Sequence, residues 1–194
     1  ILRLYDVTNG KILIDNINIK NYSLKTLRDS IGYVPQNPFL FSESIRENIK
    51  YGNYKSGQLD VEKYAKKAKV HKDIIKFNSS YETLLGERGV TLSGGQRQRI
   101  SIARALIKDP QILIFDDCLS SVDSETEDKI LKEINKIGAK KTLIITSNNI
   151  SSIVDANKIL VIKDGEIIQL GSHKKLIEVN GYYKSLYNKQ KTEK

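Results

Sequence analysis

Two adjacent glycines at the start of a helical pattern could hold a phosphate group. Residues 92–96 read Leu-Ser-Gly-Gly-Gln, and apolar residues recur at helical spacing from Gly94 to Ile107. Glycine lets backbone N–H groups come close to a phosphate, the Ser93 hydroxyl can donate one more hydrogen bond, and the positive end of the following helix points the same way. A loop with an ordinary helix N-cap is the competing interpretation. The pattern predicts a phosphate clamp.

Two carboxylates after an apolar run could hold a metal ion. Residues 112–115 read Ile-Leu-Ile-Phe, a continuous apolar run that fits a buried parallel strand, and Asp116 and Asp117 follow it. A strand that ends in a carboxylate can hold Mg²⁺, often through water, against the β and γ phosphates of a nucleotide. Asp116 is placed for that role. A strand-end turn explains two acids equally well, and the spacing from residues 92–96 favours the metal site.

The elements that must position these residues alternate between strands and helices. The first third of the sequence predicts a hairpin in 11–19 after an Asn9-Gly10 turn, a helix from Ser23 through Ser30, a strand over 31–34 ended by Pro35, and helices from Ile45 to about Phe77 interrupted over 52–57. The middle predicts a helix over 94–107, a strand over 112–115, a helix from Asp123 or Ser124 to about Ile137, and a strand over 142–146. The last part predicts a short helix, strands over 158–163 and 166–170 joined at Asp164-Gly165, and a helical tail from His173 to Tyr187. This order indicates an α/β fold with a parallel sheet.

Composition excludes several classes of function. The 194 residues carry a net charge of +9, but the lysines are interleaved with acidic residues, which indicates a solvated surface, and we expect no nucleic-acid partner. No apolar run approaches the roughly 20 residues that span a bilayer. Cys118 is the only cysteine, so an internal disulfide or a cysteine metal cluster is impossible. The chain contains no Met and begins at Ile1 in mid-pattern, so we expect a piece of a longer protein.

The segment 92–96, with the helix that follows it, resembles the signature motif of the ABC ATPases. Residues 112–117 are similar to the Walker B strand of that family, residues 120–123 to its D-loop, and residues 34–38 to its Q-loop. The resemblance extends over nearly the whole chain. It is exporter-like because of four further segments: Leu27-Arg28, Leu40-Phe41, Ile45-Arg46-Glu47-Asn48-Ile49 and Gly86-Glu87-Arg88-Gly89.

The resemblance implies a fold, two cofactors and a set of site residues. The fold is a P-loop NTPase-type parallel sheet with a helical subdomain and an antiparallel β edge, and the cofactors are ATP and Mg²⁺. An amide at Gln36 could reach both the metal and the attacking water. The implied catalytic residues are Gln36, Asp117 and Asn148; the implied metal-binding residues are Asp116 and Gln36; the implied nucleotide-binding residues are Ser93, Gly94, Gly95, Gln96 and Asp123. Helix capping is a second explanation for Asp123.

The chain departs from the family at its start. Residues 1–194 correspond to a partial nucleotide-binding domain, with a helical subdomain at about 40–107 inserted in the α/β core, and with the Walker A loop and the transmembrane domain upstream of residue 1. The only Gly-Lys pair is Gly10-Lys11, and Tyr5 stands where the first glycine of a P-loop would be. We therefore expect a fold that lacks the P-loop strand, and a fragment that is inactive and folds poorly alone because its neighbouring strands have open edges.

Two residues depart from the family at its catalytic positions. Asp117 stands where hydrolysing members have Glu, so its carboxylate lies about 1.5 Å short, and a misplacement of ~1 Å can cost about 10²-fold in rate. Asn148, followed by Asn149, occupies the position of the switch histidine, and an amide cannot gain a proton near neutral pH. Both changes predict a degenerate half-site in this subunit.

The resemblance also implies the assembly. Related subunits work as head-to-tail dimers, so the signature motif of this chain would complete an active site on a second nucleotide-binding subunit, in a homodimer or, as the degenerate half-site favours, a heterodimer. Transmembrane domains would be the other partner, at the cytoplasmic face of the cell membrane, and ATPase-coupled export the activity. The alternatives are a soluble ABC ATPase that acts on nucleic acid or ribosomes, and an inactive remnant.

Other reactive or aromatic side chains are expected to be structural. His71 and His173 lie in predicted surface positions and are interpreted as solvated, and Cys118 as a small buried residue. Aromatic residues at helical spacing near the C-terminus are expected to pack onto the sheet: Tyr182, Tyr183 and Tyr187.

Overall fold

A computed structural model describes residues 1–86, 89 and 91–192 of the chain. The chain divides into two compact units, Ile1–Ile144 and Ile145–Lys194. In the described residues no helix is both long enough and apolar enough to cross a membrane.

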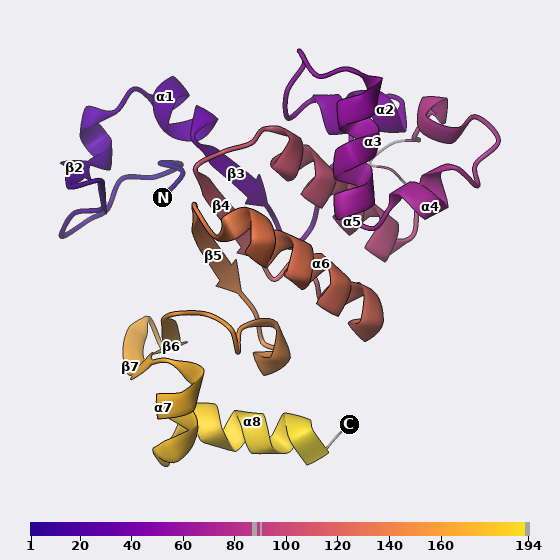
Figure 1. The fold of residues 1–194 in the computed structure, drawn as a ribbon. Helices are drawn as coiled ribbons and strands as arrows, with labels where there is room; N and C mark the ends of the chain where they lie inside the picture. The colour runs from indigo at the N-terminus through magenta and orange to yellow at the C-terminus, as the bar shows by residue number, and fades with distance from the viewer. Residues whose placement is uncertain (87–88, 90, 193–194) are drawn as a thin grey trace. The chain divides into compact units, whose positions relative to one another are not determined.

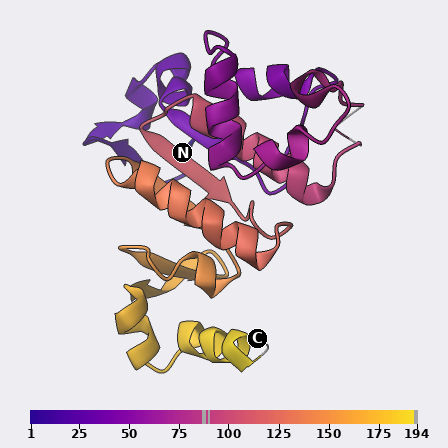
Figure 2. The same cartoon turned by 45° about the vertical axis from the view of Figure 1, so that its right-hand side comes forward.

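The first unit is built around a parallel sheet. Strand β3 (Ile31–Val34) pairs in parallel with β4 (Ile112–Asp116), and β5 (Thr142–Thr146) follows in the order β3-β4-β5. Four of the five residues of β4 are buried, as a central strand requires. Figure 2 shows helix α6 (Ser124–Gly138) alongside this strand. The predicted α/β class with a parallel sheet is confirmed.

A hairpin and a short helix precede the sheet. Strands β1 (Leu13–Ile14) and β2 (Ile17–Asn18) pair antiparallel, and Asp15 and Asn16 between them have φ of 49° and 64°, as a tight hairpin turn needs. The hairpin lies within residues 11–19, as predicted, and Gly10 in the predicted turn before it also has a positive φ, of 75°.

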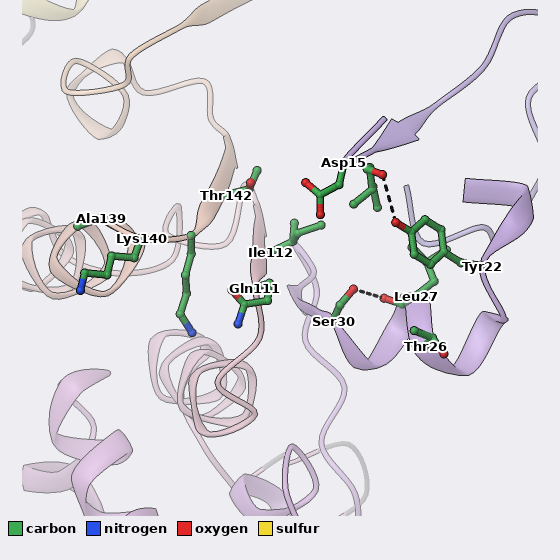
Figure 3. A pocket seen from close by; sticks show the side chains of 12 residues that line it. Asp15, Tyr22, Thr26, Leu27, Ser30, Gln111, Ile112, Ala139, Lys140 and Thr142 are labelled. Atoms are coloured by element: carbon green, nitrogen blue, oxygen red, sulfur yellow. Dashed lines mark hydrogen bonds between the residues drawn. The ribbon is translucent and has the colours of Figure 1, made fainter. Parts of the chain in front are cut away.

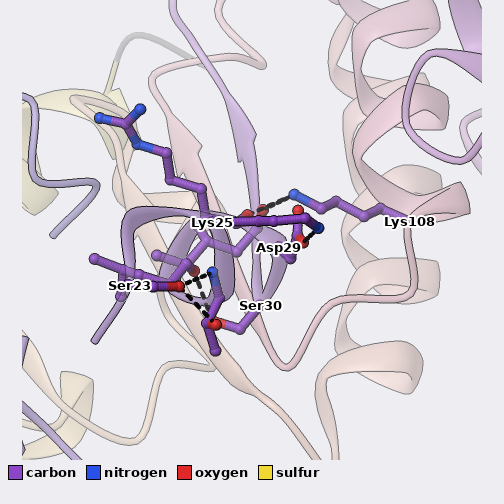
Figure 4. Close-up of polar contacts among 9 residues, drawn as sticks. Ser23, Lys25, Asp29, Ser30 and Lys108 are labelled. Carbon is purple, nitrogen blue, oxygen red and sulfur yellow. Dashed lines mark hydrogen bonds and ion pairs between the residues drawn. The ribbon is translucent and has the colours of Figure 1, made fainter.

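Helix α1 (Leu24–Asp29) follows the one-turn helix η1 (Ile19–Asn21) and begins as predicted at Ser23. The Ser23 hydroxyl accepts a hydrogen bond from the Thr26 N–H at 3.0 Å. At the other end of α1 the Lys108 ammonium donates to the Arg28 and Ile31 carbonyls (Figure 4), which links the end of α1 and the start of β3. Burial lowers the pKa of Lys108.

Short helices pack around one longer helix. Helices α2 (Ile45–Lys50), α3 (Gln58–Lys67) and α4 (His71–Ile74) and the turn η2 (Ser80–Glu82) lie between β3 and helix α5 (Gly94–Ile107) in the chain, and α2 and α3 both pack on α5 (Figure 1). These helices confirm the predicted elements. The boundary of an inserted subdomain at about 40–107 stays a prediction.

Arg104 fastens α5 to the segment around α2. Its guanidinium donates to the Asn48 backbone oxygen, the Asn48 Oδ1 and the Phe39 carbonyl, each at 2.8 Å. The rings of Phe41 and Tyr51 lie 5.5 and 5.7 Å from the guanidinium carbon. Burial lowers the pKa of Arg104 to about 10, so the group stays charged at neutral pH.

The second unit is a hairpin with helices. It contains η4 (Ile150–Ser152), β6 (Ile159–Lys163), β7 (Glu166–Gly171), α7 (His173–Glu178) and α8 (Tyr182–Thr192). Strands β6 and β7 pair antiparallel across Asp164 and Gly165, which have φ of 50° and 82°. Tyr183 is buried and Tyr187 packs against the same cluster, as predicted, whereas Tyr182 is 55% exposed, contrary to the prediction.

The tail is two helices, not the one that its periodicity predicted. Val179 has extended backbone angles at the C-cap of α7. A Cβ on Gly181 would lie 2.5 Å from the Gln169 amide nitrogen, so glycine allows the chain to approach β7 there. Periodicity alone does not show the extended residue or this approach to the Gln169 side chain.

The prediction that both histidines are solvated is wrong. The Nδ1 of His71 lies 2.8 Å from the Tyr81 hydroxyl, and that of His173 lies 2.8 Å from the Tyr183 hydroxyl. Both imidazoles are half-buried. Each histidine begins a short helix and meets a tyrosine ten residues later, a pairing that depends on the turn between them.

Candidate nucleotide-binding site

The signature segment forms a capping box at the start of α5. The Ser93 Oγ accepts from the Gln96 N–H at 3.2 Å, and the Ser93 N–H donates to the Gln96 Oε1 at 3.0 Å. The box does not engage the N–H groups of Gly94 and Gly95, the first two residues of the helix. The N-cap interpretation of Ser93 therefore holds, and it is compatible with phosphate binding, because a hydroxyl that accepts still has a proton to donate.

The loop after β4 lies against these glycines. A Cβ on Gly95 would stand 3.0 Å from the Ser121 carbonyl oxygen, whereas a Cβ on Gly94 would stand 3.7 Å from the Ser121 Cβ. Only a residue without a side chain lets the backbone at 95 approach this loop without displacing it. The start of α5 and the loop at 120–123 thus form one surface.

Three of the predicted catalytic and metal-binding residues lie together at the carboxyl ends of β3 and β4. The Gln36 Nε2 donates to the Asp117 Oδ2 at 3.0 Å, and the Tyr33 hydroxyl donates to the Asp116 Oδ2 at 3.1 Å. Asp117 has a φ of 43°, in a sharp turn after the strand. Burial, and next the hydrogen bond to Asp116, raise the pKa of Tyr33, so its hydroxyl remains a donor at neutral pH.

Tyr33 and Gln98 belong to this site but were not predicted. Tyr33 is level with Ile114 in the parallel register, so it lies one step along the sheet face from Asp116. This could have been inferred once the strands were aligned. The Gln98 Nε2 donates to the Gln36 backbone oxygen at 2.6 Å, a contact across 62 residues that no local pattern reveals.

The donor set fits a magnesium ion that is shared with phosphate. Asp116 provides a half-buried carboxylate at the end of β4, and Gln36 provides an amide oxygen on the adjacent loop. The described residues contain no group of three or more His, Cys, Asp or Glu side chains arranged for a metal. In nucleotide sites Mg²⁺ binds only a few oxygen ligands from the protein, and phosphates and waters complete its coordination shell. Asp116 and Gln36 would then hold the ion, which neutralises phosphate charge.

Asp123 is the N-cap of α6. Its Oδ1 accepts from the Thr126 N–H at 3.0 Å, and this hydrogen bond is the main cause that lowers the pKa of the carboxyl. The capping explanation therefore holds, and a role for Asp123 between two nucleotide sites stays a prediction.

Asn148 lies in the second unit, beyond β5. Its side chain is exposed, and its backbone oxygen accepts from the Gln190 Nε2 at 2.7 Å. Asn149 caps η4 through its Oδ1, which accepts from the Ser151 N–H at 3.2 Å. The catalytic position assigned to Asn148 stays a prediction.

Two further predictions concern Cys118 and the Gly-Glu-Arg-Gly stretch, and the structure describes only the first of these. Cys118 is 2% exposed, as expected, and burial raises the pKa of its thiol to about 12, which makes it unreactive. Glu87 and Arg88, which carry the exporter-like Gly-Glu-Arg-Gly stretch, lie outside the described residues.

A cavity of about 450 Å³ lies elsewhere in the first unit. Its lining includes Asp15, Tyr22, Gln111 and Lys140 (Figure 3). Gln111 precedes β4, so the cavity is at the amino end of that strand, whereas Asp116 is at its carboxyl end. Ligands of open α/β sheets bind outside the carboxyl ends. We therefore do not assign the nucleotide to this cavity.

Known proteins resemble this chain along nearly its whole length. The multidrug resistance-like ATP-binding protein MdlA of Buchnera aphidicola subsp. Schizaphis graminum is 47% identical over 192 residues, which cover 98% of this chain and 33% of that protein. The mitochondrial iron-sulfur clusters transporter atm1 of Aspergillus fumigatus is 41% identical over 192 residues, covering 98% of this chain and 26% of that protein. The chain thus spans a third or less of these relatives.

A solved structure and a family match confirm the resemblance to the ABC ATPases. The structure of a bacterial Atm1-family ABC exporter with ATP bound matches with a TM-score of 0.95 and 38% identity, over 97% of this chain and 33% of that chain. The sequence matches the family described as ABC transporter over residues 1–120, more than half of its length. This chain belongs to the ABC transporter family.

Proposed function

We propose that this chain is part of the ATP-binding subunit of an ABC exporter. In the assembly, the start of α5 clamps the terminal phosphate of an ATP·Mg²⁺ held by a second nucleotide-binding subunit, and transmembrane domains complete the transporter at the cytoplasmic face of the cell membrane. The observation that carries this is the capping box, which orders the loop while leaving the Gly94 and Gly95 N–H groups out of the cap. Support also comes from the ATP-bound exporter of matching fold.

The phosphate clamp is tested by two variants that keep the cap. Asp and Asn both cap helices well, so Ser93→Asp and Ser93→Asn should fold alike. The Asp variant places a negative charge beside the terminal phosphate, so we expect ATP turnover of the assembled transporter to fall by about 10²-fold or more, on the scale of a lost oxyanion donor. The Asn variant should lose less, because its amide still has N–H groups to donate. Steady-state ATPase assays measure both. Turnover by Ser93→Asp equal to wild type would exclude the clamp.

We further propose that the half-site formed by this subunit's own residues turns over slowly. Asp117 is one methylene shorter than the glutamate of active relatives, and its carboxylate accepts from Gln36. Asn148 cannot take up a proton near neutral pH. The partner would therefore carry a full P-loop, a catalytic Glu and a switch His, which makes the assembly a heterodimer. A neighbouring gene whose product has the same two losses would contradict this.

Restoring both residues should restore hydrolysis at this half-site. The partner's catalytic Glu is first changed to Gln, so that the remaining turnover reports only the half-site of this subunit. Against that background we expect Asp117→Glu with Asn148→His to raise turnover by about 10²-fold, the magnitude of a ~1 Å correction in position. The matched control is Asn149→His, which adds a histidine one position away. No gain from the double variant, or an equal gain from the control, would refute the degenerate half-site.

A further inference from the structure

The amide of Gln98 joins two segments of the site. Gln98 lies one turn into α5 and is 2% exposed, and its Nε2 donates to the backbone oxygen of Gln36 at 2.6 Å. The backbone oxygen of Gln36 can only accept a hydrogen bond, so the side-chain nitrogen of Gln98 must face it. The Gln98 Oε1 is buried and has no hydrogen-bond partner among the described residues.

A buried amide with one unpaired end is a poor choice for packing alone. Burial removes the amide from water, and an acceptor left unpaired costs free energy that a methionine of similar volume would not. The property of glutamine used here is therefore the N–H that it directs at the Gln36 backbone oxygen.

The contact from Gln98 closes a ring of contacts between α5, the loop at Gln36 and the loop after β4. The Gln36 side chain donates to Asp117 at 3.0 Å, and the Ser120 hydroxyl donates to the Asp117 backbone oxygen at 3.0 Å. The next residue of that loop, Ser121, lies against Gly95 of α5. The contact ring thus runs from α5 through residue 36, the end of β4 and the loop at 120–121 back to α5.

We infer that Gln98 is a positioning residue that fixes α5 to the loop at Gln36, and so holds the start of α5 in place for the partner's ATP. The inference rests on the proposed function. Gln98 itself touches no nucleotide. Loss of the Gln98 contact leaves the capped Gly94 and Gly95 in place, and these two residues bind the ATP phosphate in the proposed function. The loss should therefore lower turnover more than affinity for ATP.

Gln98→Met in the assembled, full-length transporter tests the link. It keeps the volume of the side chain and removes the donor, so we expect kcat for ATP to fall about three- to tenfold, the effect of one hydrogen bond, with KM within twofold and Tm unchanged or higher. Hydrogen exchange of residues 35–41 should become several-fold faster. Ile102→Met, on the same helix and fully buried, is the packing control and should change neither measurement.

A variant of Gln36 shows whether Gln98 acts through that residue. On a Gln36→Ala background, Gln98→Met should add less than a twofold loss in kcat, since contacting residues in one network are not additive. Unchanged kcat and exchange in Gln98→Met, or fully additive losses in the double variant, would overturn the inference. A wild-type assembly without ATPase activity would instead refute the proposed function, and the exchange measurement would still decide for or against the link.

Discussion

Adjacent glycines at the start of α5 differ in what surrounds them. At Gly94 an added methyl group would make ordinary contact with Ser121, at 3.7 Å, whereas at Gly95 it would press on the Ser121 carbonyl oxygen at 3.0 Å. Alanine favours a helix over glycine by about 1 kcal/mol, and overpacking against a backbone that cannot yield costs about 1–3 kcal/mol. The second effect applies only at Gly95.

We therefore expect Gly94→Ala to leave stability unchanged or raise it by up to about 1 kcal/mol, and Gly95→Ala to lower it by about 1–2 kcal/mol relative to Gly94→Ala. Chemical denaturation of the purified transporter, followed by a probe in this domain, measures the difference. Equal stability of the two variants would mean that the loop at 120–123 can move away from α5 at little cost, and that the contact ring is weaker than inferred.

At the scale of elements, one guanidinium links α5 to the segment around α2. Arg104 reaches two backbone oxygens and one amide oxygen, and its donors form a fork that an ammonium cannot reproduce. We expect Arg104→Lys to lower the free energy of unfolding by about 2–3 kcal/mol, because the backbone and side-chain oxygens of the buried Asn48 lose donors. The control is Arg46→Lys in α2, where the partly exposed ion pair with Glu82 predicts a loss below about 1 kcal/mol. Similar losses in both variants would contradict the assignment.

Local signals predict the elements well and their contacts poorly. The helix over 94–107 and the strand over 142–146 match the structure to the residue, because a cap or a turn residue marks their ends. The break between α7 and α8 was missed because periodicity does not show the extended backbone at Val179 or the approach of Gly181 to the Gln169 side chain of β7.

The same division holds for the candidate site. Asp116 and Gln36 could be predicted, since each lies at or just after the end of a strand, and parallel strands end at one edge of a sheet. The partners that orient them could not, because Tyr33 acts through strand register and Gln98 through a contact across 62 residues. Spacing in the sequence thus identifies groups that could do chemistry, and only packing shows what holds them.

At the scale of the whole molecule, apolar strand faces remain open to solvent. Strand β5 lies at the edge of the β3-β4-β5 sheet, and its three central residues, Leu143, Ile144 and Ile145, are only half-buried. In the second unit, β6 and β7 form a two-stranded sheet, and five apolar side chains on it are 44–65% exposed: Leu160, Ile162, Ile167, Ile168 and Leu170. Isolated two-stranded sheets are marginally stable, and open apolar edges recruit other chains.

We therefore expect the 194-residue chain alone to associate and to show no cooperative thermal transition as a monomer. Calorimetry with size-exclusion chromatography measures both properties. The cross-strand pair Ile162 and Ile167 provides a control, since Ile162→Lys with Ile167→Glu removes exposed apolar surface and leaves β5 unchanged. This variant should be more soluble and still lack a cooperative transition, because charge at one surface does not supply the burial that the sheet edge lacks. A sharp transition of monomeric wild-type chain would show that the core around β4 is sufficient by itself.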